Sequence, residues 1–208
     1  MSQPNKRSCT APIPGELNSD LGEFWVDDPW QINQSHNLSS FEKNQFFLNS
    51  QGKDFLNLSH ISGADSDGDA RCAVAADFLN SGKLDLIVRQ VGGGGLLLYQ
   101  NEFADGNFIK IHLRGNPSNS LGIGAKVKAT LEDGKTYHQS LFPVNSFRSQ
   151  SPNVIHLGLG EAESVEKLQV TWPSGKEITF SNIQSNQTLL IKEWEEQPKV
   201  ISENSSIQ

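Results

Sequence analysis

The sequence predicts an all-β protein, and three observations support this class. Glycine is plentiful, with 18 in 208 residues, and turn sequences separate the apolar segments, which are short. Several of these segments alternate with polar residues at the two-residue period of a half-buried strand. The stretch 147–175 contains two apolar runs of strand length, each closed by a turn that contains glycine. Short strands with many turns are typical of all-β folds.

The clearest single strand is predicted at 165–171. Val165, Leu168 and Val170 alternate there with charged and polar residues, as expected for a strand with one buried face. Pro173-Ser174-Gly175 follows Trp172 and supplies a fixed φ and then a residue free to take a positive φ. We therefore expect a hairpin turn that leads into a second strand at 177–180.

Composition and charge exclude several classes of partner. The net charge is −7, from 17 basic and 24 acidic residues spread along the chain. A nucleic-acid or anionic-membrane surface requires a basic patch, so neither partner is expected. No apolar stretch approaches the roughly 20 residues that cross a bilayer. Residues 1–16 lack the apolar core of a secretory signal, so the protein either stays inside the cell or is a fragment of a longer one.

The N-terminal half is predicted to contain an irregular arm at 1–44 and a strand-rich module at 45–104. A hairpin is expected from Phe46–Asn49 and Phe55–Leu58, joined by a loop that contains glycine. Three further strands are expected at 73–78, 84–89 and 96–100. Five short strands separated by turns form a meander, the unit of a β-propeller blade.

Two turns in this module are candidate metal sites. Asp65, Asp67 and Asp69 place three carboxylates at alternate positions around a glycine, a pattern that suits calcium because its hard oxygen ligands must converge at a sharp bend. A plain Asp/Gly turn is the alternative. The second candidate is the turn from Asp77 to Asp85.

Residues 49–101 resemble an FG-GAP/VCBS-type repeat, a propeller blade whose hairpin loop often has the pattern Asp-x-Asp-x-Asp-Gly-x-x-Asp and binds calcium. The resemblance implies that Asp77 and Asp85 are calcium ligands. Leu79 and Ser81 stand where two further carboxylates are usual, and Lys83 adds a positive charge. Because calcium affinity follows the number of charged ligands, a metal-free hairpin of the same shape is the alternative.

A second module is predicted at 107–193, followed by a frayed polar tail at 194–208. Ile109, Ile111 and Leu113 alternate with polar residues, which predicts one core face and one solvent face, with Lys110 and His112 on the latter. His156 lies in an apolar strand beside a glycine turn, so we expect a structural histidine that is hydrogen-bonded.

This second module closely resembles the ASPIC/UnbV domain, which implies a β-sandwich-like fold. The matching motifs occur in family order: 113–115 with 118–119, 122–127, 146–150, 156–160, 172–175 and 186–187. The family usually follows FG-GAP/VCBS repeats in bacterial secreted proteins and in the cartilage acidic protein group. The resemblance therefore implies an extracellular or periplasmic location. Ser120 replaces the usual arginine, and 142–145 replaces a stretch richer in glycine; both departures weaken the argument for a ligand surface there and leave the expected fold unchanged.

The sequence contains no signature of catalysis. The five histidines are dispersed, and there is no Gly-x-Ser-x-Gly nucleophile turn. Our main hypothesis is a non-catalytic binding or interaction module, with calcium as a candidate cofactor and a protein, extracellular-matrix or carbohydrate partner. The rival hypothesis is an accessory protein, or an enzyme without an obvious motif, in a biosynthetic or intracellular system.

A single blade would leave its edge strands and one face exposed, because repeat units bury their core against neighbours. Three arrangements remain open. The blade packs on the second module and the N-terminal arm, a partner chain covers it, or preceding blades belong to a longer protein.

Overall fold

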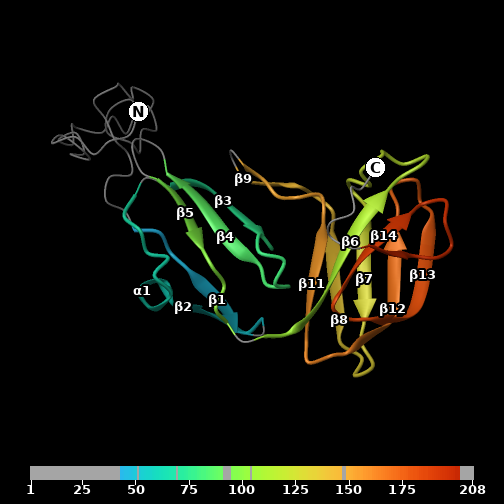
Figure 1. Ribbon diagram of the computed structural model, residues 1–208, viewed down its shortest axis with the longest axis horizontal. Coiled ribbons are helices and arrows are strands. Elements are labelled where there is room, and N and C mark those ends of the chain that lie inside the picture. Colours follow the sequence, from blue (N-terminus) through green and yellow to red (C-terminus); the bar gives the residue numbers. More distant parts are fainter. Residues whose placement is uncertain are drawn as a thin grey trace, which may run out of the picture. The chain divides into compact units, whose positions relative to one another are not determined.

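The computed structural model describes residues 43–50, 52–68, 70–90, 95–103, 105–146 and 149–201. The regular structure there is β-strand except for one helical turn, α1 (Ser59–Ser62), which confirms the predicted all-β class (Figure 1). The chain divides into two compact units. The first contains Met1–Cys72 and Val88–Leu97, and the second contains Ala73–Ile87 and Leu98–Gln208. The arm predicted at 1–44 lies outside the described residues except for its last two positions.

The predicted N-terminal hairpin is confirmed to within one residue. Strands β1 (Phe47–Ser50) and β2 (Asp54–Asn57) pair in antiparallel orientation, with Phe47 opposite Asn57. A separate sheet has the strand order β3-β4-β5, formed by β3 (Ala70–Ala76), β4 (Asp85–Gln90) and β5 (Leu96–Tyr99).

The expectation of one continuous meander is wrong in the described residues, because the five strands form two sheets. Helix α1 and the left-handed residue Gly63 (φ +71°) follow β2 and interrupt the path to β3.

The first unit buries little apolar surface within the described residues. Phe47, Phe55 and Ile61 are 51%, 63% and 73% exposed, and Val88 is the only buried apolar residue among those of this unit that the structure describes. The buried hydrophobic cluster of the described residues lies in the second unit.

The second unit contains two four-stranded sheets. The first has the order β11-β6-β14-β15, from β6 (Asn107–Arg114), β11 (Ile155–Gly160), β14 (Gln187–Lys192) and β15 (Lys199–Ile201). The second has the order β13-β12-β7-β8, from β7 (Lys126–Thr130), β8 (Thr136–Ser140), β12 (Ser164–Thr171) and β13 (Glu177–Gln184). A short pair, β9 (Val144–Ser146) and β10 (Ser149–Gln150), follows β8. Strand β14 pairs with β6 in parallel, and the other pairs are antiparallel.

One core joins the two sheets. Ile109, Ile111 and Leu113 of β6 form a single buried cluster with Val165, Leu168 and Val170 of β12, and all are at most 1% exposed. The two sheets therefore pack face to face as a β-sandwich (Figure 1). The predicted core face of 109–113 is confirmed, but Lys110 is 6% exposed, so its predicted solvent exposure is wrong.

A local irregularity explains why Val165 and Leu168 both face the core although they are three residues apart. On the paired strand β13, Ser181 and Asn182 are both exposed between buried Phe180 and Ile183. Asn182 has a φ of +55°, a left-handed conformation that asparagine tolerates better than most residues. At this point two consecutive residues face solvent on each strand, Glu166 and Lys167 on β12 and Ser181 and Asn182 on β13. The alternation of buried and exposed residues is therefore shifted by one position on both strands.

The predicted hairpin turns at 132–135 and 173–175 are confirmed by the β7–β8 and β12–β13 pairs. The prediction of a frayed tail after 193 is wrong at Lys199–Ile201, because this segment forms β15 and pairs with β14. Backbone hydrogen bonding to an open edge does not require apolar side chains, so the polar composition concealed this strand.

We predict that Gly122→Ala destabilises the sandwich more than Gly134→Ala does. Both glycines have positive φ, +67° and +81°, and an alanine in this region costs about 1–2 kcal/mol. A Cβ at Gly122 would lie 2.7 Å from Leu113 Cβ and 3.2 Å from the Trp172 ring, whereas a Cβ at Gly134 meets nothing within 4 Å. Overpacking at Gly122 therefore adds about 1–3 kcal/mol to the loss in that variant. The free energy of unfolding of both variants is measured in urea. Equal losses in the two variants would contradict the close packing at Gly122.

Candidate functional site

A row of four side chains crosses the outer face of the β11-β6-β14-β15 sheet. His156 lies opposite Lys110, Lys110 opposite Thr188, and Thr188 opposite Ile201. Directly opposed residues share one face of a sheet, and neighbouring strands are about 4.8 Å apart, so the row is about 14 Å long. It forms the floor of a pocket.

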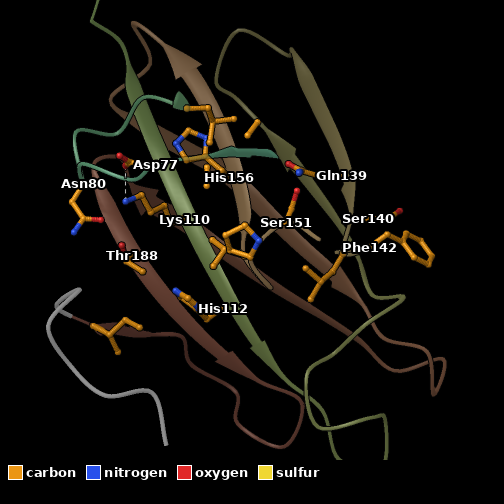
Figure 2. A pocket seen from close by; sticks show the side chains of 17 residues that line it. Asp77, Asn80, Lys110, His112, Gln139, Ser140, Phe142, Ser151, His156 and Thr188 are labelled. Atoms are coloured by element: carbon orange, nitrogen blue, oxygen red, sulfur yellow. Dashed lines mark ion pairs between the residues drawn. The ribbon is translucent and has the colours of Figure 1, made fainter. Parts of the chain in front are cut away.

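The pocket has a volume of about 490 Å³ and lies within the second unit. Residues from the β3–β4 connection form one wall, and residues at the end of β8 and before β11 form the other (Figure 2). The lining residues are Ala75, Ala76, Asp77, Asn80, Leu84, Lys110, His112, Gln139, Ser140, Leu141, Phe142, Ser151, Pro152, Val154, His156, Thr188 and Ile201.

A buried ion pair joins the floor to the first wall. Lys110 Nζ lies 2.7 Å from Asp77 Oδ2, and the two side chains are 8% and 4% exposed (Figure 2). The carboxylate also accepts hydrogen bonds from the backbone amides of Ser81 and Gly82. Burial acts to raise the pKa of Asp77, but the hydrogen bonds from Lys110, Gly82 and Ser81 outweigh it, so this pKa lies below its ordinary value of 3.8. Asp77 is therefore ionised and fixes the turn around it.

His156 attaches the same turn to β11. Its Nε2 lies 2.9 Å from the carbonyl oxygen of Gly82, and its ring stacks on Phe108 with the ring centroids 5.7 Å apart. Burial lowers the pKa of His156 below 6.5, and the nearby Gly82 carbonyl and Asp77 offset this only in part. The imidazole is therefore neutral at pH 7, and Nε2–H donates to the carbonyl. The predicted hydrogen bond of His156 is confirmed.

The rest of the pocket presents neutral hydrogen-bonding groups beside apolar ones. Asn80, Gln139 and Ser151 face the space together with Leu84, Pro152 and Val154. In the described part of the chain, no hydrogen bond joins the pocket serines, Ser140 and Ser151, to a histidine. The arrangement is suited to holding a molecule by hydrogen bonds and apolar contact.

A second buried carboxylate, that of Glu193, lies at the end of β14 and is 0% exposed. It accepts hydrogen bonds from the amides of Asn116 and Ser118 and from the hydroxyls of Ser118 and Ser174. Burial acts to raise the pKa of Glu193, but these hydrogen bonds outweigh it, so the pKa lies below its ordinary value of 4.5. The motif residues Ser118 and Ser174 are thus structural partners of this carboxylate.

The structure separates the predicted metal ligands into different environments. Asp65 pairs with Lys43 at 2.8 Å, Asp67 lies in the same loop, and Asp69 is outside the described residues. Asp85 accepts a hydrogen bond from the Asn101 amide through Oδ1, and its buried Oδ2 has no hydrogen-bond partner among the described residues. Within the described ranges, no three histidine, cysteine or carboxylate side chains are grouped closely enough to bind a metal ion.

The turn from Asp77 to Asp85 does not fit calcium in this conformation. The ammonium of Lys110 lies against the Asp77 carboxylate, where a bound cation would have to lie, and two backbone amides point at the same oxygens. Calcium would have to displace Lys110 from this site.

Sequence reasoning missed Lys110, Thr188 and Glu193. Lys110 belongs to an alternating pattern whose polar members are usually solvated, and Thr188 joins the row through a parallel pairing of distant strands. Glu193 follows the buried run 188–191, and an acidic residue there gave no sign that it was fully buried.

The fold and the pocket define a β-sandwich domain with a candidate binding site on the outer face of one sheet. Residues 115–198 match the sequence model of the family described as "ASPIC and UnbV". The chain therefore contains an ASPIC/UnbV domain, as the motifs predicted, although the matched range begins and ends later than the expected 107–193. A search of curated proteins found no match. The described residues include no helix long and apolar enough to span a membrane.

We predict that Glu193→Ala costs about 2–3 kcal/mol of unfolding free energy, because it removes a buried acceptor from four part-buried donors. Glu195→Ala is the matched control. It removes a partly exposed partner of Lys192, so its cost is at most about 1 kcal/mol. Equal losses in urea denaturation would show that Glu193 does not organise this end of the sandwich.

The pH dependence tests the same carboxylate. Because the folded-state pKa of Glu193 is depressed, its stabilisation is fully present above pH 4.5 and is lost as the pH falls through the folded pKa. Glu193→Gln removes the titrating group, so its stability is expected to fall less steeply than that of the wild type below pH 4.5. An unchanged slope would contradict the depressed pKa.

Proposed function

We propose that this chain is a non-catalytic binding module whose pocket binds a small, uncharged, hydroxyl-rich ligand such as one sugar unit of a carbohydrate. One observation carries the proposal. The pocket of about 490 Å³ is lined by neutral polar and apolar side chains, and its charged side chains, Asp77 and Lys110, are already paired with each other.

The charge balance of the pocket favours an uncharged ligand. An ion that entered would lose its hydration, and the Asp77–Lys110 pair has no free charge to offset that loss. A sugar unit carries hydroxyls that match the amide of Gln139 and the hydroxyl of Ser151, while its C–H face packs on Val154. The ligand class thus follows from the chemistry of the walls.

The state of His156 supports a binding role over catalysis. Its Nε2–H is used by the Gly82 carbonyl, and its lowered pKa leaves the ring neutral at pH 7, so it carries no imidazolium proton to transfer there. General acid catalysis at pH 7 requires a group that is protonated there.

We also propose an extracellular or periplasmic location and a role in adhesion or as a scaffold. The ASPIC/UnbV match over 115–198 supports this proposal, together with the resemblance of 49–101 to an FG-GAP/VCBS repeat. Carbohydrates of a cell surface or of the extracellular matrix are suitable ligands for such a module.

The test of the pocket uses an array of neutral mono- and oligosaccharides probed with the purified chain. Ser151→Phe places a ring at a position that lines the pocket and is expected to weaken binding of the best saccharide at least tenfold. Thr136→Phe adds the same ring at an exposed position of β8 and is expected to bind like the wild type. The proposal is wrong if no saccharide binds, or if Ser151→Phe binds as tightly as the wild type.

Calcium binding at Asp65, Asp67 and Asp69 remains a prediction of its own. A ligand that binds only the folded state raises the melting temperature, so millimolar calcium is expected to give a rise of a few degrees over EDTA. Asp67→Ala is expected to abolish the rise, and Asp133→Ala, which removes the same charge from an exposed turn, is expected to keep it. Identical melting curves of the wild type in calcium and EDTA would identify this loop as a plain turn.

A further inference from the structure

The outer face of the β13-β12-β7-β8 sheet gathers cations. Lys128 of β7 lies between His138 of β8 and Gln169 of β12, and Lys126 of β7 lies between Ser140 and Thr171 in the next row. Lys167 of β12 lies opposite Thr130, one row further along. We call the surface formed by Lys126, Lys128, His138 and Lys167 the basic face.

The lysines of the basic face have no acidic partner among the described residues, since no carboxylate lies within 4.0 Å of the ammonium of Lys126, Lys128 or Lys167. Glu177 lies opposite Thr171 at the edge of this surface, and its two oxygens accept hydrogen bonds from Gln169 and Thr171, while Glu166 is exposed beside Lys167. A protein with a net charge of −7 thus presents a locally positive sheet face.

A groove of about 290 Å³ runs over this surface and is lined by Lys126, Lys128 and His138 together with neutral groups of Ser140, Gln169 and Thr171. None of the large exposed apolar residues in the described part of the chain lies on β7, β8, β12 or β13. Protein interfaces rely on buried aromatic and apolar anchors, and single-stranded nucleic acids stack their bases on aromatic side chains. The basic face provides neither of these.

We propose that the basic face binds an acidic polysaccharide, a carbohydrate whose sugar units carry sulfate or carboxylate groups. The lysine ammonium groups pair with the anionic substituents, and Gln169 and Ser140 bond the hydroxyls between them. Lys126 and Lys128 are two residues apart on one strand, about 7 Å, and Lys167 continues the line on the next strand. An extended polyanion that follows β7 therefore meets a cation at each row.

This surface meets the pocket of the proposed function at Ser140, which lines both, but the floor of that pocket lies on the other sheet and its charges are paired. The basic face is solvent-exposed, so its attraction is screened by salt. Binding of the polyanion is therefore expected to weaken steeply with ionic strength, whereas binding of a neutral sugar in the pocket is not.

The test titrates the purified chain with a sulfated oligosaccharide, a heparin fragment of defined length, at several salt concentrations. Lys126→Gln/Lys128→Gln is expected to weaken binding at least tenfold at low salt and to reduce the slope of log K against log salt by about two. Lys53→Gln/Lys199→Gln removes the same charge at exposed positions elsewhere and is expected to bind like the wild type. Equal melting temperatures of the variants establish that each is folded.

Other outcomes would overturn the proposal. Absence of binding at low salt would do so, as would equal weakening in both double variants, which indicates an effect of net charge alone. Equal affinity for a poly-glutamate peptide would assign the basic face to acidic proteins, and equal affinity for single-stranded DNA would assign it to nucleic acid.

Discussion

The buried carboxylate of Glu193 holds the end of the sandwich on which the site depends. It joins the segment after β6, the turn after β12 and the end of β14, and the Glu193 carbonyl accepts a further hydrogen bond from Lys176 at 2.6 Å. The Glu193 amide donates to the backbone carbonyl oxygen of Arg114, which extends the β6–β14 pairing by one step. Because a carboxylate with no solvent exposure must have its hydrogen bonds satisfied, these segments can approach in few ways. The parallel register of the adjoining β6–β14 pair places Thr188 beside Lys110.

The Asp77–Lys110 ion pair fixes the pocket wall, because it attaches the turn between β3 and β4 to the sheet. The lysine comes from a central strand of the sheet, so it supplies a rigidly placed positive charge to the turn between β3 and β4. Loss of either partner would leave a buried charge uncompensated, which is far more costly than the pair itself is stabilising. The turn is further fixed by the His156–Gly82 hydrogen bond. The geometry of the wall is therefore set by the sheet that forms the floor.

Local patterns predicted the strands well and the site poorly. The hairpins at 47–57, 126–140 and 164–184 depend on neighbouring strands and on turn residues, so their sequences contain the necessary information. The row at the floor depends on β14 pairing with β6, which is nearly eighty positions earlier, and no local period encodes that choice. Lys110 and Glu193 are charged residues whose burial is possible only because distant groups satisfy them. The motifs of the ASPIC/UnbV match identified the domain because they include those distant groups, such as Ser118 and Ser174.

The two outer faces of the sandwich differ for a physical reason. Over the β11-β6-β14-β15 sheet, the turn at 77–84 shields Lys110 from water, so its charge had to be neutralised and the remaining surface is suited to neutral groups. Nothing of this kind is required of Lys126 and Lys128, which are exposed and keep their hydration. Their charges are available to a partner at little desolvation cost, but each contact is weak and sensitive to salt. Affinity at that face must therefore come from several contacts made at once, which a polymer with repeated anionic groups provides and a single small ion does not.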